Sequence, residues 1–192
     1  MLKHELRKVF LSKRLLLSKE EIELNSIKII KSLTENFNVL NKNICTFFPI
    51  STKKEINTFL FFDFIQKFDF KLFTTRWNRK TNELSVHKIN QKEDLVLNEY
   101  QIPEPKDTIS CEINYENLNF IIIPLLCFDK QGNRVGYGKG IYDKFLSKLD
   151  NSKSIFIGVS LLDPVDLIYD TNEFDIKLDY CITPEKIYHF EK

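Results

Sequence analysis

Four of the chain's five glycines lie in one short stretch, GNRVGYGKG, between Gly132 and Gly140. Glycine permits positive φ and lets a ligand approach the backbone closely. The stretch follows an apolar strand-like run and precedes a helical pattern, an arrangement in which free backbone N–H groups can bind an anion. It is neither a Walker A loop nor GxGxxG, because Lys139 is followed by Gly140 and position 141 is isoleucine. A phosphate-binding loop and a purely structural turn with a helix cap both remain open.

The two cations of this stretch favour the phosphate-binding interpretation. Lys139 stands at the expected helix N-terminus, where a positive charge opposes the helix dipole. Its i+4 partner Asp143 gives the weaker order for a helical ion pair. A phosphate group explains such a cation better than helix stability does, and Arg134 offers a second, bidentate donor.

Alternating helices and strands are expected to position this loop. Apolar residues at helical spacing predict a helix over residues 2–17, and Ser18 with Glu21 forms a capping box that starts a second helix. Phe120-Ile121-Ile122-Ile123 is apolar on both faces, as a central parallel strand must be. Further helices are expected over 55–68 and from about 138 to 149, and β segments over 44–48, 71–75, 84–89, 94–98, 155–160 and 180–183. Residues 102–105 are expected to form a rigid extended segment, because each proline fixes its own φ.

This alternation predicts the fold class. We expect a three-layer α/β/α fold with a mainly parallel central sheet, preceded by an N-terminal helical pair. The length is that of one domain, covering residues 1–192.

Composition excludes several classes of protein. The 28 basic and 27 acidic residues give a net charge of +1, which excludes a globally basic nucleic-acid binder. No apolar run approaches the roughly 18 residues of a membrane span, and the first residues do not form a secretion signal. The cysteines form no CxxC pair, which argues against a zinc site built from close cysteine pairs and favours reduced thiols: Cys45, Cys111, Cys127 and Cys181. We expect a cytoplasmic monomer without nucleic-acid or membrane partners.

The segment from Pro124 to Asp143 resembles a family signature. It reads PLLCFDKQGNRVGYGKGIYD and is similar to P-x-L-x-F-D-x-x-G-x-R-L-G-x-G-x-G-Y-Y-D of the 5-formyltetrahydrofolate cyclo-ligases, also called 5,10-methenyltetrahydrofolate synthetases. Supporting segments are Lys3-x-x-x-Arg7 with Arg14, SKEE at 18–21, EINT at 55–58, IPEP at 102–105, and Asp175-x-x-Leu178-Asp179.

The resemblance implies an ATP-dependent ligase. ATP would phosphorylate the formyl oxygen of 5-formyltetrahydrofolate, N10 would attack the activated carbon, and phosphate would leave, giving 5,10-methenyltetrahydrofolate and ADP. Such a step needs charge neutralisation and positioning more than covalent chemistry by the protein.

The resemblance also implies roles for individual residues. Lys139 and Arg134 would be catalytic, with Lys139 on the transferring group. Asp143 and Asp179 would hold Mg²⁺, directly or through water. The residues implied for ATP are Lys3, Arg7, Arg134, Gly136, Tyr137, Gly138, Lys139, Gly140, Ile141 and Tyr142. Those implied for the folate are Phe48, Ile50, Glu55, Tyr137 and Lys139.

Each assignment has a simpler alternative from the residues alone. Lys3 and Arg7 share a helix face but are typical of solvated surface charge. Glu55 fits the first turn of the expected helix, where the dipole favours a carboxylate. Asp179 fits a surface position on an edge strand.

The chain departs from the family pattern at two places. Position 141 is isoleucine where the family usually has an aromatic residue, which puts a ring contact there in question. Lys53 and Lys54 add two cations before Glu55.

Two other functions remain open at this stage. A sugar-phosphate isomerase or acyl-CoA transferase would use the same phosphate-loop arrangement with a general base and no metal pair. A nucleotide- or folate-binding module without turnover is the other alternative, against which Lys139, Asp143 and Asp179 argue.

Overall fold

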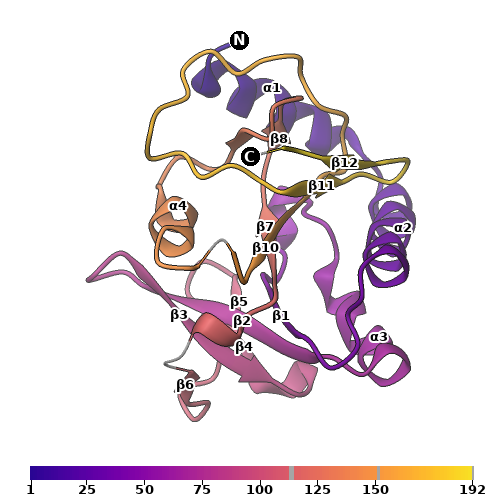
Figure 1. Cartoon of the computed structure of the whole chain (residues 1–192), viewed down its shortest axis with the longest axis vertical. Coiled ribbons are helices and arrows are strands. Elements are labelled where there is room, and N and C mark those ends of the chain that lie inside the picture. The colour runs from indigo at the N-terminus through magenta and orange to yellow at the C-terminus, as the bar shows by residue number, and fades with distance from the viewer. Residues whose placement is uncertain (113–114, 151, 192) are drawn as a thin grey trace.

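One twisted sheet forms the centre of the computed structural model, which describes residues 1–112, 115–150 and 152–191 (Figure 1). Its strand order over those residues is β12-β11-β10-β7-β1-β2-β3-β6. The consecutive neighbours from β2 through β1, β7 and β10 to β11 run parallel, whereas β3, β6 and β12 are antiparallel additions at the two edges. The strands are β1 Asn43–Thr46, β2 Lys71–Asn78, β3 Glu83–Ile89, β6 Cys111–Glu112, β7 Phe120–Pro124, β10 Ile155–Val159, β11 Tyr180–Ile182 and β12 Ile187–His189.

Two small hairpin-like sheets lie beside the central one. They pair β4 Leu95–Leu97 with β5 Pro103–Pro105, and β8 Cys127–Phe128 with β9 Arg134–Val135. The helices are α1 Lys3–Leu16, α2 Lys19–Asn36, α3 Phe61–Phe68 and α4 Ile141–Leu146, with 3-10 turns η1 Ser51–Lys53, η2 Thr58–Leu60, η3 Lys92–Asp94 and η4 Tyr115–Asn117.

Alternating side chains of the strands build the three layers. Phe120 and Ile122 of β7 belong to an apolar cluster with α2 and α3, whereas Ile121 and Ile123 belong to a second cluster with Phe145 of α4. Successive strand residues point to opposite faces, so a strand apolar throughout must be covered on both sides. Figure 1 shows α2 and α3 on one side of the sheet and α4 on the other. The predicted three-layer, mainly parallel fold is confirmed.

The N-terminal helical pair is also confirmed, and its two helices have different tasks. Ser18 starts α2 with the expected capping box, accepting from the Glu21 N–H at 3.1 Å. Helix α1 instead buries Leu6 and Phe10 against the β8–β9 hairpin at Cys127 and Val135. It therefore crosses one end of the sheet (Figure 1), where it can face the glycine-rich loop.

The predicted helices before α3 and α4 begin later than the sequence pattern suggests. The helix predicted from residue 55 begins only at Phe61. Lys54 has a left-handed backbone with φ 49°, residues 55–57 belong to no regular element, and Thr58–Leu60 form the 3-10 turn η2. The helix predicted over about 138–149 is shorter and covers Ile141–Leu146. It begins only at Ile141 because Gly138 and Gly140 have positive φ, +93° and +64°. Lys139 consequently lies outside the helix, directly before the N-cap residue Gly140.

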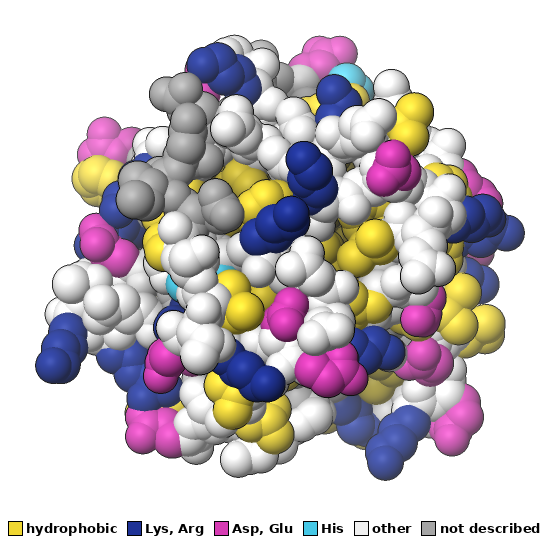
Figure 2. Space-filling view, turned by 90° about the horizontal axis from the view of Figure 1, so that it is seen from below, with side chains coloured by type: hydrophobic (Ala, Val, Ile, Leu, Met, Phe, Trp, Pro, Cys, Tyr) yellow, Lys and Arg dark blue, Asp and Glu magenta, His cyan; other side chains and the backbone are white. Residues whose placement is uncertain are grey.

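The surface carries charges of both signs, and three of the four cysteines are buried. Lys and Arg side chains are interspersed with Asp and Glu on the face seen in Figure 2. Across the described residues, the helices are too short or too polar to cross a bilayer. Cys45, Cys127 and Cys181 are buried free thiols, and burial raises the pKa of the Cys45 and Cys127 thiols to about 12.

Candidate active site

A cavity of about 780 Å³ opens at the carboxyl ends of the parallel strands. Phe48 follows β1, Thr75 belongs to β2, and Pro124 ends β7, and all three line it. In open α/β sheets, ligands bind outside the carboxyl ends where neighbouring strands lead in opposite directions. The neighbours of β1 here are β2 and β7, so the cavity lies at such a switch point.

Nearly all of the predicted site residues converge on this cavity. It is lined by Lys3, Arg7, Phe48, Ile50, Glu55, Arg134, Gly136, Tyr137, Gly138, Lys139, Gly140, Ile141, Tyr142 and Asp143. They come from α1, from the segment after β1, and from the stretch between β9 and α4. Asp179 is not among the lining residues.

Arg7 and the glycine-rich loop are in direct contact. The Nε of Arg7 donates to the Gly136 carbonyl at 3.0 Å. A Cβ at Gly138 would lie 3.2 Å from the Arg7 guanidinium carbon, and Gly138 also has positive φ. Close approach and backbone conformation therefore both favour glycine at this position. The exposed residues that follow, through Gly140, form the rim of the cavity.

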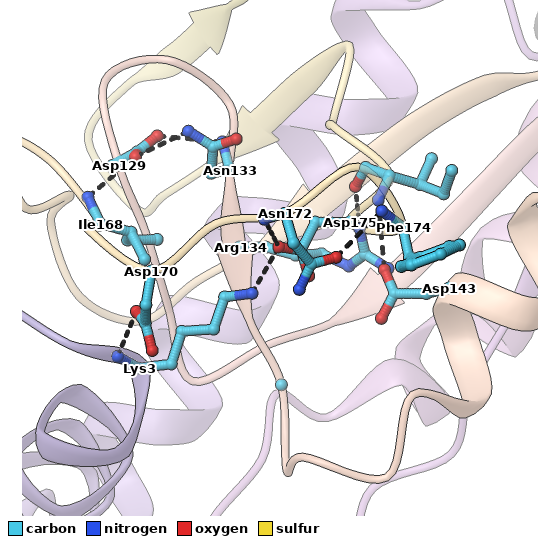
Figure 3. Close-up of polar contacts among 12 residues, drawn as sticks. Lys3, Asp129, Asn133, Arg134, Asp143, Ile168, Asp170, Asn172, Phe174 and Asp175 are labelled. Carbon is cyan, nitrogen blue, oxygen red and sulfur yellow. Dashed lines mark hydrogen bonds and ion pairs between the residues drawn. The ribbon is translucent and has the colours of Figure 1, made fainter.

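Asp129 shapes the turn that precedes the loop. It is fully buried, and its Oδ1 accepts from the backbone N–H groups of Gln131 and Asn133 at 3.0 and 2.9 Å. Its Oδ2 accepts from the Asn133 side-chain amide and the Ile168 N–H at 2.9 and 3.1 Å (Figure 3). These four bonds explain an aspartate in the FD-x-x-G part of the signature as a structural residue, a role the sequence did not reveal.

The amine of Lys139 lies over an aromatic ring. Its Nζ is 4.2 Å from the centroid of Trp77, which also lines the cavity from β2. An exposed cation–π contact contributes about 0.5–1 kcal/mol. A phosphate group can compete with so weak a contact, and the flexible lysine side chain allows the movement.

An ion pair links α1 to the segment that precedes β11, and hydrogen bonds with Ile176 link Arg134 and Asp143 to the same segment (Figure 3). Lys3 pairs through Nζ with Asp175 and donates its backbone N–H to Asp170 Oδ1 at 2.7 Å. Arg134 pairs with Asp143 at 2.7 Å. Asp170, Asn172 and Asp175 all line the cavity, and the sequence analysis gave none of them a role. The sequence did contain a sign of their involvement, because Asp175 begins the Asp175-x-x-Leu178-Asp179 segment and the other two polar residues lie shortly before it.

Arg134 is engaged within the protein. Its side chain is 5% exposed, and its donors bind Asp143 Oδ1 and the Ile176 carbonyl. Burial lowers the pKa of the guanidinium, and the neighbouring Asp143 charge opposes that change. In this structure Arg134 orients Asp143 instead of offering the free bidentate donor expected from the sequence.

The predicted metal pair is not assembled. Asp143 Oδ1 accepts from Arg134 and from the Ile176 N–H, and Asp143 borders the cavity. Asp179 Oδ2 accepts from the Phe156 N–H at 2.7 Å, near the amino end of β10 and thus toward the edge of the sheet opposite the cavity. Residues 176–179 are not in a strand, so the edge-strand position suggested as the simpler alternative for Asp179 is wrong. Among the described residues, no three His, Cys, Asp or Glu side chains are grouped to hold a metal ion.

The remaining donors still suit Mg²⁺ if it arrives with phosphate. Magnesium typically takes one or two carboxylates and completes its shell with water and phosphate oxygens. Asp143 retains its second carboxylate oxygen, for which no partner is found in the described residues. Asp175 lines the same cavity and could supply the second carboxylate, the role that the sequence assigned to Asp179.

A buried carboxylate marks the other end of the cavity. Glu55 is 6% exposed; its Oε2 accepts from the Ile50 N–H at 2.7 Å and its Oε1 from the Tyr137 hydroxyl at 2.5 Å. Burial raises the pKa of Glu55, and the Ile50 and Tyr137 hydrogen bonds oppose the rise. Glu55 lies outside the helices, six residues before α3 begins, so the alternative of a first-turn helix carboxylate is excluded.

Apolar groups surround this carboxylate. Phe48 packs against Phe59 and Phe62 with ring centroids 4.8 and 5.7 Å apart, and Ile50 adds a second apolar side chain to the cavity. A charged acceptor set in an apolar wall suits a flat heterocycle that carries N–H donors at one edge.

The fold and this cavity together define an α/β enzyme that joins a basic glycine-rich loop to an apolar pocket with a buried acid. Residues 1–184 match the 5-formyltetrahydrofolate cyclo-ligase family, and the chain belongs to that family. The resemblance drawn from the signature and the expectation of an enzyme are thereby confirmed.

Individual relatives agree over most of the chain. A probable 5-formyltetrahydrofolate cyclo-ligase of Schizosaccharomyces pombe is 28% identical, with 96% of each chain covered. The 5-formyltetrahydrofolate cyclo-ligase of Mus musculus is 25% identical over 86% of this chain and 85% of its own. The solution structure of Aquifex aeolicus 5,10-methenyltetrahydrofolate synthetase superposes with a TM-score of 0.80 at 30% identity, covering 100% of this chain and 94% of that one.

Proposed function

We propose that the chain converts 5-formyltetrahydrofolate to 5,10-methenyltetrahydrofolate with consumption of ATP. One observation carries the proposal. A single cavity joins the glycine-rich loop and its cations to a buried carboxylate in an apolar wall, and both sets were named from the family signature. Membership of the family supports the reaction.

The cationic end would bind the triphosphate. Lys139 would leave Trp77 for the transferring phosphoryl group, and Arg7 would contact ATP while holding the loop at Gly136. Lys3 would also face the nucleotide. Phosphoryl transfer depends on charge stabilisation and alignment, which these cations and the N–H groups of the loop would provide.

Magnesium would be held by Asp143, with Asp175 as the second acid on the cavity and water completing its shell. When bound, the ion would neutralise phosphate charge. Arg134 would keep Asp143 in place through the 2.7 Å ion pair.

The apolar end would hold the folate. Glu55 would accept hydrogen bonds from the amino and ring N–H groups of the pterin, and Phe48 and Ile50 would contact its faces. This would place the formyl oxygen toward Lys139. The γ-phosphoryl group would move from ATP to that oxygen, with ADP as the leaving group. N10 would then attack the carbon and lose its proton, and the formyl oxygen would leave with the phosphate.

The test is formation of the methenyl-folate chromophore by the purified chain. We expect absorbance to grow only when Mg²⁺, ATP and 5-formyltetrahydrofolate are all present, with ADP and phosphate released in equal amounts. Absence of turnover with retained binding of both ligands would favour the non-catalytic module. ATP-independent isomerisation of a sugar phosphate, or acyl transfer to coenzyme A, would favour the other enzyme classes.

A further inference from the structure

Arg14 is a buried cation on a helix that otherwise carries its charges at the surface or on the cavity. It is 6% exposed and lies on the face of α1 that also buries Leu6 and Phe10. Its NH1 donates to the Leu125 carbonyl at 3.1 Å, and its NH2 donates to the Tyr137 hydroxyl. Its Nε is buried without a hydrogen-bond partner in the described structure. Burying a guanidinium with an unsatisfied N–H group destabilises the folded state, so packing alone does not explain the position of Arg14.

The hydrogen bonds of Arg14 set the direction of a donor chain. Arginine has no acceptor, so the Tyr137 oxygen must accept from Arg14. The phenol's one hydrogen is then available to Glu55 Oε1, 2.5 Å away. This arrangement is satisfied best when Glu55 is an anion, which accepts on both oxygens. The positive charge of Arg14 thus reaches Glu55 through Tyr137.

The charged and titratable groups around Glu55 are few. Arg14 approaches from α1, Lys53 from η1, and Tyr137 and Tyr142 from the stretch that ends in α4. Lys54 is turned to the end of α1, where its amine binds the Leu17 carbonyl at 2.6 Å. Arg14 and Lys53 are therefore the cations that oppose the effect of burial on Glu55.

We propose that Arg14 is a positioning residue of the folate site: through Tyr137 it keeps Glu55 anionic and oriented to accept the pterin's hydrogen bonds. The same contact links α1 and the glycine-rich loop to the folate end of the cavity. The inference rests on the proposed function for its ligand, whereas the link between Arg14 and Glu55 can be tested without any ligand.

The ligand-free test is the titration of Glu55 followed by carboxyl ¹³C NMR, with the signal assigned from Glu55→Gln. We expect Arg14→Met to raise the pKa of Glu55 by about one unit or more, because a nearby opposite charge shifts a carboxyl pKa by about 1–3 units. Arg14→Lys, which keeps the charge, should titrate closer to wild type. Lys13→Met removes the adjacent, exposed cation of α1 and should leave the titration unchanged. If Arg14→Met does not fold, Arg14→Gln removes the same charge while keeping a donor for Leu125.

The ligand-dependent test is KM for 5-formyltetrahydrofolate against pH. Only the anion accepts both pterin N–H groups, so affinity is lost as pH falls through the folded pKa of Glu55. A pKa raised in Arg14→Met moves this loss to higher pH. We expect KM near wild type at high pH and about tenfold above wild type below both pKa values, with KM for ATP unchanged.

The outcomes separate the inference from the proposed function. An unchanged Glu55 titration in Arg14→Met overturns the inference whatever the enzyme catalyses. If the wild type does not turn over the folate but the pKa of Glu55 is raised in Arg14→Met, the proposed function is overturned and the electrostatic link between Arg14 and Glu55 still holds. Turnover with parallel pH profiles for wild type and Arg14→Met overturns the positioning role, because a merely structural arginine would change KM equally at every pH.

Discussion

The charged groups at the two ends of the cavity differ in their exposure to solvent. At the loop end, Lys3 pairs with Asp175, and Lys139 lies over Trp77, all of them at least partly accessible. At the other end, Glu55 is 6% exposed and is held by a backbone N–H and a phenol. The first set can exchange partners, whereas the second has its geometry set before any ligand arrives.

This difference follows from solvation. The cation–π contact of the exposed Lys139 contributes about 0.5–1 kcal/mol, so a phosphate group could replace it at little cost. A buried carboxylate that loses a donor pays about 1–3 kcal/mol or more in unsatisfied desolvation. Changes at the loop end should therefore alter turnover and metal dependence. Changes at the buried end should alter folate affinity and its pH dependence.

The largest effect is expected for Lys139→Ala. Loss of one charge-assisted contact made mainly in the transition state should cost about 2–4 kcal/mol, or about 10² to 10³ in kcat. The ATP-induced change in fluorescence of the chain's single tryptophan, Trp77, should also disappear, because the amine no longer leaves its ring. Lys144→Ala, an exposed lysine of α4 that pairs with Glu83, is the control. A kcat for Lys139→Ala within about threefold of wild type would remove Lys139 from the transferring group.

A smaller effect, on a different constant, is expected for Glu55→Gln. The amide keeps the shape but loses the charge, and hydrogen bonds to charged groups contribute about 1.5–3 kcal/mol, so KM for the folate should rise about 10- to 100-fold. KM for ATP should stay near wild type. Glu104→Gln changes another carboxylate on the same cavity and serves as the control. If both variants raise KM equally, the contrast between the two ends does not hold.

The metal prediction distinguishes two aspartates. Asp143→Asn should raise the Mg²⁺ concentration needed for half-maximal rate about tenfold, because the amide keeps an acceptor for Arg134 but lacks the charge. Asp179→Asn should leave that concentration unchanged, since its carboxylate binds the Phe156 backbone. Rate measured against free Mg²⁺ decides the matter, and the reverse pattern would restore Asp179 as the metal ligand.

The smallest effect is expected for Ile141→Tyr. Ile141 is half-buried at the start of α4 and lines the cavity, where the family usually has an aromatic residue. A restored ring contact is worth about 0.5–1.5 kcal/mol, so KM for one substrate should fall about three- to tenfold with kcat little changed. Separate KM values for ATP and the folate identify which ring is contacted. A rise in both would mean that the site is overpacked.

Local patterns located the elements and most of the cavity. Three features depend on only a few neighbouring residues and could therefore be predicted from the sequence: the apolar run at β7, the Ser18 capping box and the clustered glycines. The residues of the family signature were also identified from the sequence alone, because their spacing marks the position of the glycine-rich loop. The starts of α3 and α4 were missed because positive φ at Lys54, Gly138 and Gly140 overrode the apolar periodicity.

Contacts across the chain decided the rest. Arg14 lies far in sequence from Tyr137 and Glu55, Lys3 from Asp175, and Asp179 from Phe156, and no local spacing predicts such pairs. The sequence by itself determined a mainly parallel α/β sheet, the position of the glycine-rich loop and the family. Only the tertiary structure decided which charges are dry and which carboxylates face the cavity, because burial and the choice of partner depend on segments that meet after the sheet has formed.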